Sequence, residues 1–558
     1  MTGRITIKMF PCIALTATLV AMAALGVSNY DSYAAGLNQL ESAPRLAVVM
    51  VVDQMRADYL SRWEPQYTDG LHRLLTHGAY FPHAMHAHAH TVTAVGHATI
   101  ATGAFPSHHG IVGNSYYDRT CGRSISAVAD TTTTTLGGHG STGASPHNLL
   151  RTALGDWLKH VSPSSKVFAA SLKDRAAVFP GGKGPDCAFW YDKKTGDFVT
   201  STYYTDALPD WTAAFDNSGL KDIWRDSLWI KSAPDDMYQF EDVIEAEKGG
   251  DQSDFPHTIS GNTKTDTEDY YYGLYLTPFA DAYLLDFCRQ LLHEEHLGED
   301  TVPDLLMISL SAADLVGHDY GPHSNEIQDY YLRLDYQLGR FLDSLDAAVG
   351  KGNYLFALTS DHGVCPLPEL AVAMGMPDAR RLMSDDFKAD VARVLVESFP
   401  GCEHAASLLK YVDGGFVIDS AVASECGLSI GDAYQRTAAA LEKLEYVADV
   451  FTYDQLKSTE DDRPFAGLFR NSFHPDRSPD LVVNFKEGVL LTSSKYGTSH
   501  GTPYHYDTDV PIVFYGPGVA AGRHNETVNT VDLAPTMAAL MRIKPEKLVD
   551  GRILRVTK

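Results

Sequence analysis

Short, continuous runs of apolar residues recur along the chain, and each is interpreted as a strand. The runs cover residues 45–52 (RLAVVMVV), 304–311 (DLLMISLS), 354–359 (YLFALT) and 510–515 (VPIVFY). Such runs are typical of strands buried on both faces of a parallel sheet. The first run ends at Asp53, the second leads to Asp314, and the third ends at Asp361 and His362. Acidic residues therefore follow three of the predicted strands.

Between these runs, apolar residues recur at helical spacing. The clearest patterns lie in residues 331–345 and in residues 531–541. Strands that alternate with helices predict an α/β fold with a mostly parallel central sheet flanked by helices. In such sheets the functional residues lie beyond the carboxyl ends of the strands. We therefore expect the acidic residues to meet at one edge of the sheet.

Two segments interrupt this alternation. Residues 181–269 are rich in Trp, Tyr, Asp and Gly, and residues from about 400 to 479 are mixed and polar. Neither segment has a clear helix or strand period. We interpret both as insertions that cover the active edge of one catalytic domain, which spans residues 35–558.

Residues 1–34 have the three parts of a secretory signal peptide. Arg4 and Lys8 precede an apolar stretch, and Ser32-Tyr33-Ala34 fits a small-x-small cleavage site. The alternative is an uncleaved membrane anchor. We expect a mature protein that is periplasmic or secreted and that has no membrane association after cleavage.

Composition limits the classes of binding partner, and the number of cysteines does not show which of them form disulfides. The 558 residues are 44% hydrophobic and carry a net charge of −26, which disfavours nucleic acid and anionic membranes as partners. An anionic substrate would need a local positive charge, such as a metal ion. Six cysteines follow the signal peptide, and their 15 possible pairings cannot be separated by sequence. They are Cys121, Cys187, Cys288, Cys365, Cys402 and Cys426.

Six side chains near the predicted edge have the chemistry of metal ligands. They are Asp53, Asp314, His318, Asp361, His362 and His500. Asp314 and His318 are four residues apart and so share one face of a helical turn. Three aspartates and three histidines suit two zinc ions. Each residue alone is more simply a capping aspartate or a buried histidine, but the repetition at separate strand ends favours a metal site.

A hydroxyl precedes these ligands in the chain. Thr93 opens a predicted helix in the segment HTVTAVGHA, and a helix N-terminus favours a bound anion or an alkoxide. The alternative is an ordinary N-cap threonine. His86, His88 and His90 alternate with alanine just before it. We expect these three histidines to lie on an exposed edge rather than to bind a metal.

Taken together, these motifs resemble the alkaline phosphatase superfamily, in particular the exported phosphatases and phosphodiesterases with a threonine nucleophile. The matching segments follow the family's order. They are VVDQMRADYL from Val51, TVTAVGHA from Thr91, HGIVGN ending at Asn114, DLVGH from Asp314, SDHG from Ser360, SHGTPYHYD from Ser499 and VDLAPT from Val531.

The resemblance implies an alkaline-phosphatase-like fold and a role for each residue. Thr93 matches the nucleophile, and Asn114 matches the residue that binds a phosphoryl oxygen. One zinc would be held by Asp314, His318 and His500. The other would be held by Asp53, Asp361 and His362, together with Thr93.

Lys173 and Arg175 narrow the predicted activity. They lie two apart in the segment SLKDR, so on an extended segment they would point the same way. In the family branch that hydrolyses phosphate monoesters, a K-x-R pair contacts the phosphoryl group. A monoester dianion has one more charged oxygen than a diester, and two cations match it. The alternative is a pair of solvated surface charges.

These implications predict an exported, zinc-dependent phosphomonoesterase. It would cleave small phosphate monoesters to phosphate and an alcohol through a phosphothreonine. One alternative is a phosphodiesterase or nucleotide pyrophosphatase on the same two-zinc site. A different class is an exported zinc-binding protein without turnover, which would need neither Thr93 nor the pair Lys173 and Arg175.

Overall fold

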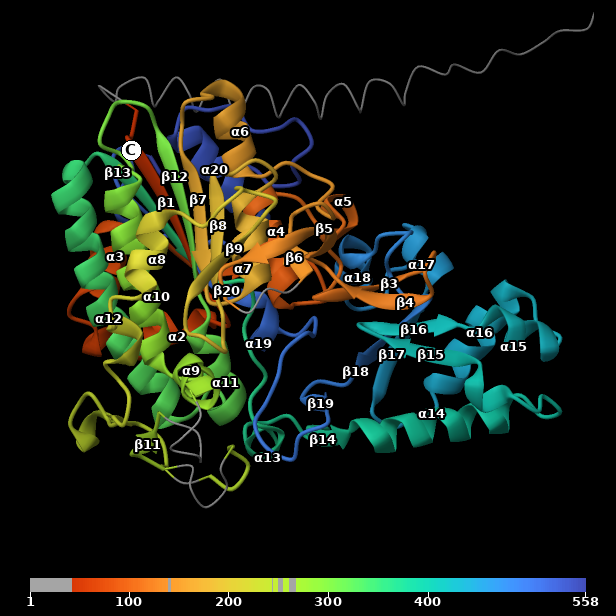
Figure 1. Ribbon diagram of the computed structural model, residues 1–558. Helices are drawn as coiled ribbons and strands as arrows, with labels where there is room; N and C mark the ends of the chain where they lie inside the picture. The colour runs from red at the N-terminus through yellow and green to blue at the C-terminus, as the bar shows by residue number, and fades with distance from the viewer. Residues whose placement is uncertain (1–42, 139–141, 243, 249–253, 260–266, 558) are drawn as a thin grey trace, which may run out of the picture.

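The computed structural model describes residues 43–557 apart from 139–141, 243, 249–253 and 260–266. A central sheet runs through it, and β1 (Leu46–Val52) lies between β12 (Asp304–Leu310) and β13 (Tyr354–Thr359), parallel to both (Figure 1). The register pairs Val51 with Ser309 and with Thr359. The three predicted strands therefore end side by side, which explains why their acidic residues meet.

The sheet is parallel at its centre and mixed toward its edges. Among the described residues, twelve strands join in the path β21-β2-β20-β13-β1-β12-β7-β8-β9-β5-β6, with β22 beside β2. The outer strands are β5 (Ala129–Leu136), β6 (Thr142–Ala144), β21 (Gly522–Arg523) and β22 (Val528–Asn529). The expected α/β class is confirmed, but the strand β20 (Asp509–Tyr515) runs antiparallel to β13 rather than parallel. It also pairs antiparallel with β2 (Ala79–Met85). A continuous apolar run indicates that both faces of a strand are buried, but it does not indicate whether the strand runs parallel or antiparallel to its neighbours.

Alternate residues of β1 pack into two separate hydrophobic cores. Leu46, Val48 and Met50 contact the layer of α10 (Pro278–Glu294) and α12 (Asn325–Leu345). Ala47, Val49 and Val51 face the opposite layer, which contains α4 (Thr93–Thr102), α7 (Asp174–Gly181) and α20 (Leu533–Leu540). This alternation follows from the period of two along a strand. The helical patterns at 331–345 and 531–541 correspond to α12 and α20.

A small lobe, defined here as residues 380–492, lies beside the sheet with a hydrophobic core of its own (Figure 1). Its antiparallel sheet has the order β15-β16-β18-β17, and the helices α14 (Ser384–Ser398) and α16 (Ile430–Leu441) pack on it. The strands are β15 (Leu409–Val412), β16 (Gly415–Ile418), β17 (Val447–Thr452) and β18 (Leu481–Phe485). The lobe contains the whole segment 400–479 that was expected to be an insertion.

The first expected insertion, 181–269, begins inside the sheet. β8 (Cys187–Tyr191) pairs with β7 (Val167–Ser171), and β9 (Phe198–Ser201) pairs with β8. A disulfide joins Cys402 and Cys426 in the small lobe, and the other described cysteines are free thiols. The predicted signal peptide lies outside the described residues. Within those residues, no helix has the length and apolar character needed to cross a bilayer.

Candidate active site

The six predicted metal ligands come together at the carboxyl edge of the sheet. Asp53 follows β1, and Asp361 and His362 follow β13. Asp314 and His318 lie on α11 (Ala312–Tyr320), which follows β12. His500 comes from the loop before α19 (His505–Thr508). Short loops at three adjacent strand ends therefore place residues that are up to 447 positions apart around one point.

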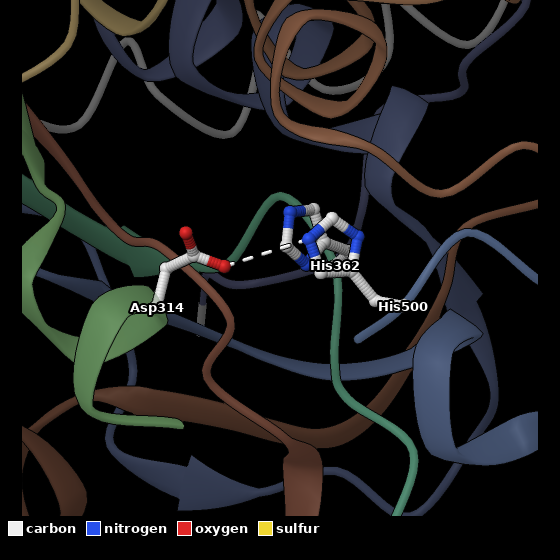
Figure 2. Close-up of side chains that lie close together, drawn as sticks. All are labelled: Asp314, His362 and His500. Carbon is white, nitrogen blue, oxygen red and sulfur yellow. Dashed lines mark ion pairs between the residues drawn. The ribbon is translucent and has the colours of Figure 1, made fainter. Parts of the chain in front are cut away.

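Within the described part of the chain, the ligand atoms form two compact groups. Asp53, Asp361 and His362 form one group, and the ligand atoms of each group lie within 4.8 Å of one another. Asp314, His362 and His500 form the other group, which Figure 2 shows. The rings of His362 and His500 stack at 3.6 Å. His362 thus takes part in both groups. His318, which the resemblance assigns to the second group, has its Nε2 3.1 Å from Asp314 Oδ1.

The three imidazoles are held in the same tautomer. Nδ1 of His318, His362 and His500 lies 2.8, 2.9 and 2.8 Å from the carbonyl oxygens of Thr498, Gly363 and Thr91 respectively. A carbonyl oxygen only accepts, so each Nδ1 donates and each Nε2 presents a lone pair. Nε2 is the atom that faces the aspartates in all three rings. A fixed tautomer of this kind is typical of metal-binding histidines.

Several of these acceptors are buried without a donor. Asp53 Oδ1, Asp361 Oδ2 and His362 Nε2 have no hydrogen-bond partner among the described residues. Burial and the neighbouring Asp361 carboxylate raise the pKa of Asp53 well above its ordinary value. Among the described residues, three buried aspartate carboxylates lie beside one lysine ammonium here, so the negative charge exceeds the positive charge. Oxygen and imidazole acceptors in such a set fit divalent cations such as zinc.

Lys173 supplies the one ammonium at this point. Its Nζ donates to Asp53 Oδ2 and to Asp314 Oδ2, both at 2.6 Å, and so bridges the two ligand groups. The expectation that Lys173 and Arg175 lie on an extended segment is wrong, because α7 begins at Asp174. Both side chains nevertheless approach the ligands, Lys173 at Asp53 and Asp314 and Arg175 in the cavity that Asp314 also lines. Arg175 lines a cavity beside the ligands, and none of the described residues accepts a hydrogen bond from its buried Nε.

Thr93 and Asn114 line the same cavity, whose volume is about 440 Å³. α4 begins at Thr93, as predicted, and its N-cap is Val92, so the threonine hydroxyl is not used as a cap. The side-chain oxygen of Asn114 accepts from the backbone N–H of Ala94 at 2.9 Å. That bond ties the asparagine to the first turn of α4 and leaves its amide NH₂ available as a donor.

Sequence reasoning missed Gln54. Its backbone N–H donates to Asp361 Oδ1 at 3.1 Å, and its side-chain amide donates to Asp314 Oδ1 at 2.7 Å. It adopts φ 67°, a left-handed conformation that is rare for glutamine. A Cβ added at Gly317 would lie 1.8 Å from Gln54 Oε1, so a larger residue there would displace the Gln54 side chain. Gln54 directly follows Asp53, but nothing in that spacing reveals the contacts.

The alternating histidines are not on an exposed edge. His86 and His88 are fully buried, which corrects that expectation, and only His90 reaches the cavity. His86 Nε2 lies 3.0 Å from the carbonyl oxygen of Ser360, and its Nδ1 lies 3.0 Å from the hydroxyl of Thr530. The segment follows β2 and lies outside its pairing with β20, and the Ala89 N–H donates to the hydroxyl of Ser472 on α18 (Ala466–Ser472).

Comparisons with known proteins agree with this geometry. Residues 47–507 match the family model described as type I phosphodiesterase / nucleotide pyrophosphatase. The alkaline phosphatase PafA of Elizabethkingia meningoseptica is 34% identical over 515 residues, which are 90% of this chain and 92% of that one. The alkaline phosphatase PhoV of Synechococcus elongatus is 32% identical, with 92% of this chain and 93% of that one covered.

The fold agrees as well. The crystal structure of wild-type PafA superimposes with a TM-score of 0.84 at 32% identity, and the match covers 92% of this chain and 99% of that one. A PafA variant in which a threonine is replaced by serine, and an asparagine, a lysine and an arginine by alanine, gives a TM-score of 0.83. The chain belongs to the type I phosphodiesterase / nucleotide pyrophosphatase family of the alkaline phosphatase superfamily, and it is a phosphatase.

Proposed function

We propose that this phosphatase is an exported, zinc-dependent phosphomonoesterase that works through a phosphothreonine at Thr93. Its substrates would be small phosphate monoesters, and its products phosphate and an alcohol. One observation supports the proposal most strongly. Three histidines with the same fixed tautomer and three buried aspartates converge beside a cavity that Thr93 also lines.

The ligand set would hold two zinc ions. Asp53, Asp361 and His362 would hold one together with Thr93, and Asp314, His318 and His500 would hold the other. Bound zinc lowers the pKa of a hydroxyl or water and stabilises negative charge on oxygen. The buried acceptors without donors fit this role, since a proton or a cation must offset them.

The chain's own groups would perform two displacements. Thr93 Oγ forms a bond to phosphorus while the bond to the ester oxygen breaks, and the departing alcohol takes up a proton. Water then attacks the phosphothreonine from the opposite side and releases phosphate. The Asn114 amide and the Arg175 guanidinium, which both line the cavity, would hold the phosphoryl oxygens as charge shifts between them.

Lys173 and Arg175 would give the preference for monoesters. Together they add positive charge that the extra charged oxygen of a monoester can use. The variant of PafA described above is altered at a threonine, an asparagine, a lysine and an arginine, in that order. Thr93, Asn114, Lys173 and Arg175 are the same four residue types in the same order. This parallel supports a shared set of reacting groups.

A comparison of two substrates tests the proposal. Rates are measured for an aryl phosphate and for its methyl diester, with enzyme that is chelator-treated and with enzyme reloaded with zinc. We expect monoester turnover to disappear with chelation, to return with zinc, and to exceed diester turnover. Faster cleavage of the diester would instead support the phosphodiesterase or nucleotide pyrophosphatase activity that the family description includes.

Export is a separate part of the proposal. The disulfide between Cys402 and Cys426 supports it, because disulfides persist mainly in oxidising compartments. N-terminal sequencing of the protein recovered from the periplasm or the medium should find Ala35 as the first residue. A retained Met1 would indicate the uncleaved membrane anchor.

A further inference from the structure

The small lobe closes the far side of the cavity that contains Thr93. Most of the lobe's lining residues are apolar, and among them are Tyr411, Phe416, Phe469, Phe473 and Phe485. Of the described lobe residues that line the cavity, only Asp413 is charged. A volume of about 440 Å³ is in the range of small-molecule sites, so there is room for the alcohol portion of an ester.

Asp413 is held close to the phosphoryl-binding asparagine. It sits at the tip of the hairpin between β15 and β16, and its Oδ2 accepts from the backbone N–H and the hydroxyl of Ser115, both at 3.2 Å. Ser115 directly follows Asn114. The Asp413 side chain is one third exposed (33%), and no described residue donates a hydrogen bond to Asp413 Oδ1. A carboxylate oxygen of Asp413 is therefore available at the wall of the cavity that Asn114 also lines.

His90 lies beside this oxygen. Its Nδ1 donates to the carbonyl oxygen of Val112 at 2.8 Å. His90 Nε2 lies 3.9 Å from Asp413 Oδ1. Gly113 permits this arrangement, because a Cβ there would lie 3.0 Å from Asp413 Oδ2 and 2.5 Å from the Ser115 carbonyl oxygen. The hairpin tip is thereby held beside Asn114, and the second carboxylate oxygen of Asp413 can accept from a donor in the cavity.

We propose that Asp413, beside His90, forms a subsite for a hydrogen-bond donor on the alcohol portion of the substrate. The donor is a hydroxyl or an ammonium close to the ester oxygen, and the apolar wall of the small lobe receives the rest of the leaving group. The same carboxylate would disfavour a second anionic group. This inference rests on the proposed phosphomonoesterase activity and adds the class of leaving group.

Three matched substrates test the subsite. They are 2-phenylethyl phosphate, 2-hydroxy-2-phenylethyl phosphate and 2-amino-2-phenylethyl phosphate, which share an apolar body and differ only in the donor. kcat/KM is measured for each with the wild type, with Asp413→Asn and with Asp413→Ala. Asp385→Asn is the control, since Asp385 is 95% exposed on α14 of the same lobe. The ratio of a donor ester to the plain ester, compared between proteins, cancels differences in intrinsic leaving-group reactivity.

We expect both Asp413 variants to lower that ratio about 10- to 100-fold, which corresponds to the loss of one charge-assisted hydrogen bond. The hydroxyl and amino esters show which donor is preferred. Activity on the plain ester shows that a variant is folded. If only one of the two Asp413 variants is active, that variant alone decides the test. Ratios equal to those of the wild type and of Asp385→Asn would overturn the subsite. A wild type that cleaves none of the three esters would instead overturn the proposed phosphomonoesterase.

Discussion

Replacing Arg175 with alanine should lower the rate of monoester hydrolysis much more than the rate of diester hydrolysis. The guanidinium lines the cavity with Thr93 and Asn114. Among the described residues its ion-pair partner is the neighbouring Asp174, at a loose 3.8 Å, and its side chain is 30% exposed. Its removal therefore breaks few contacts within the protein. The change acts mainly on a bound phosphoryl group.

The expected size follows from one lost charge-assisted hydrogen bond. Such bonds contribute roughly 1.5–3 kcal/mol. Since about 1.36 kcal/mol is tenfold in rate, kcat/KM for a monoester should fall about 10- to 150-fold. A diester has an esterified oxygen where the monoester has a charged one, so its hydrolysis should fall much less. Zinc content should not change, because the hydrogen bond and ion pair of Arg175 within the described residues are made with Asp174, which is not one of the six ligands.

Lys173→Ala should behave differently from Arg175→Ala. Its ammonium is shared by Asp53 and Asp314, so alanine leaves two buried carboxylates without their donor. Unpaired buried charge is costly. We expect zinc retention to fall and both substrates to lose rate, in addition to any loss specific to the monoester. The double variant should reduce monoester kcat/KM by about 10²–10⁴.

The assay uses an aryl phosphate and its methyl diester with the wild type and both single variants, and zinc is counted by mass spectrometry. Arg393→Ala is the control, because Arg393 lies on α14 with its side chain 53% exposed. Equal losses on both esters in Arg175→Ala would refute the reasoning. So would a loss of zinc in that variant.

Three further outcomes are expected. Thr93→Ala should abolish the labelled phosphoprotein that acid quenching traps, while zinc content stays at two ions because only a hydroxyl and a methyl are lost. Thr93→Ser should keep measurable activity. Label found on another residue of the wild type would contradict this assignment. His362→Ala should reduce zinc content as well as rate, since His362 belongs to both ligand groups, and an unchanged count of two ions would contradict it. Gln54→Ala should weaken zinc binding roughly 10- to 100-fold, because it removes the amide that orients Asp314. The zinc affinity is measured by competition with a chromogenic chelator, and an unaltered affinity would exclude that role.

The parts of the molecule that follow from local periodicity could be predicted. The apolar runs at β1, β12 and β13 identify buried strands, and the rule for carboxyl ends then places Asp53, Asp314 and Asp361 together. The direction of β20 could not be predicted, because burial of both faces gives the same pattern in either direction.

Contacts between distant segments were also beyond the sequence. The spacing of Lys173 and Arg175 suggested an extended segment, yet a helix begins at Asp174, and Lys173 pairs with two aspartates while Arg175 lines the cavity. The bonds of Gln54 depend on a left-handed backbone and on the close approach of Gly317. Such tertiary contacts arise from packing between elements, which no local pattern records.

The hydrogen bonds from the three imidazoles to carbonyl oxygens have a consequence for engineering. The acceptors belong to the main chain of Thr91, Gly363 and Thr498, so each ring is aimed by the path of a loop rather than by another side chain. Residues in these loops can therefore be exchanged for others of similar backbone preference without turning a ring. Insertions and deletions there would move the carbonyls themselves, so loop length is the property that a redesign must preserve.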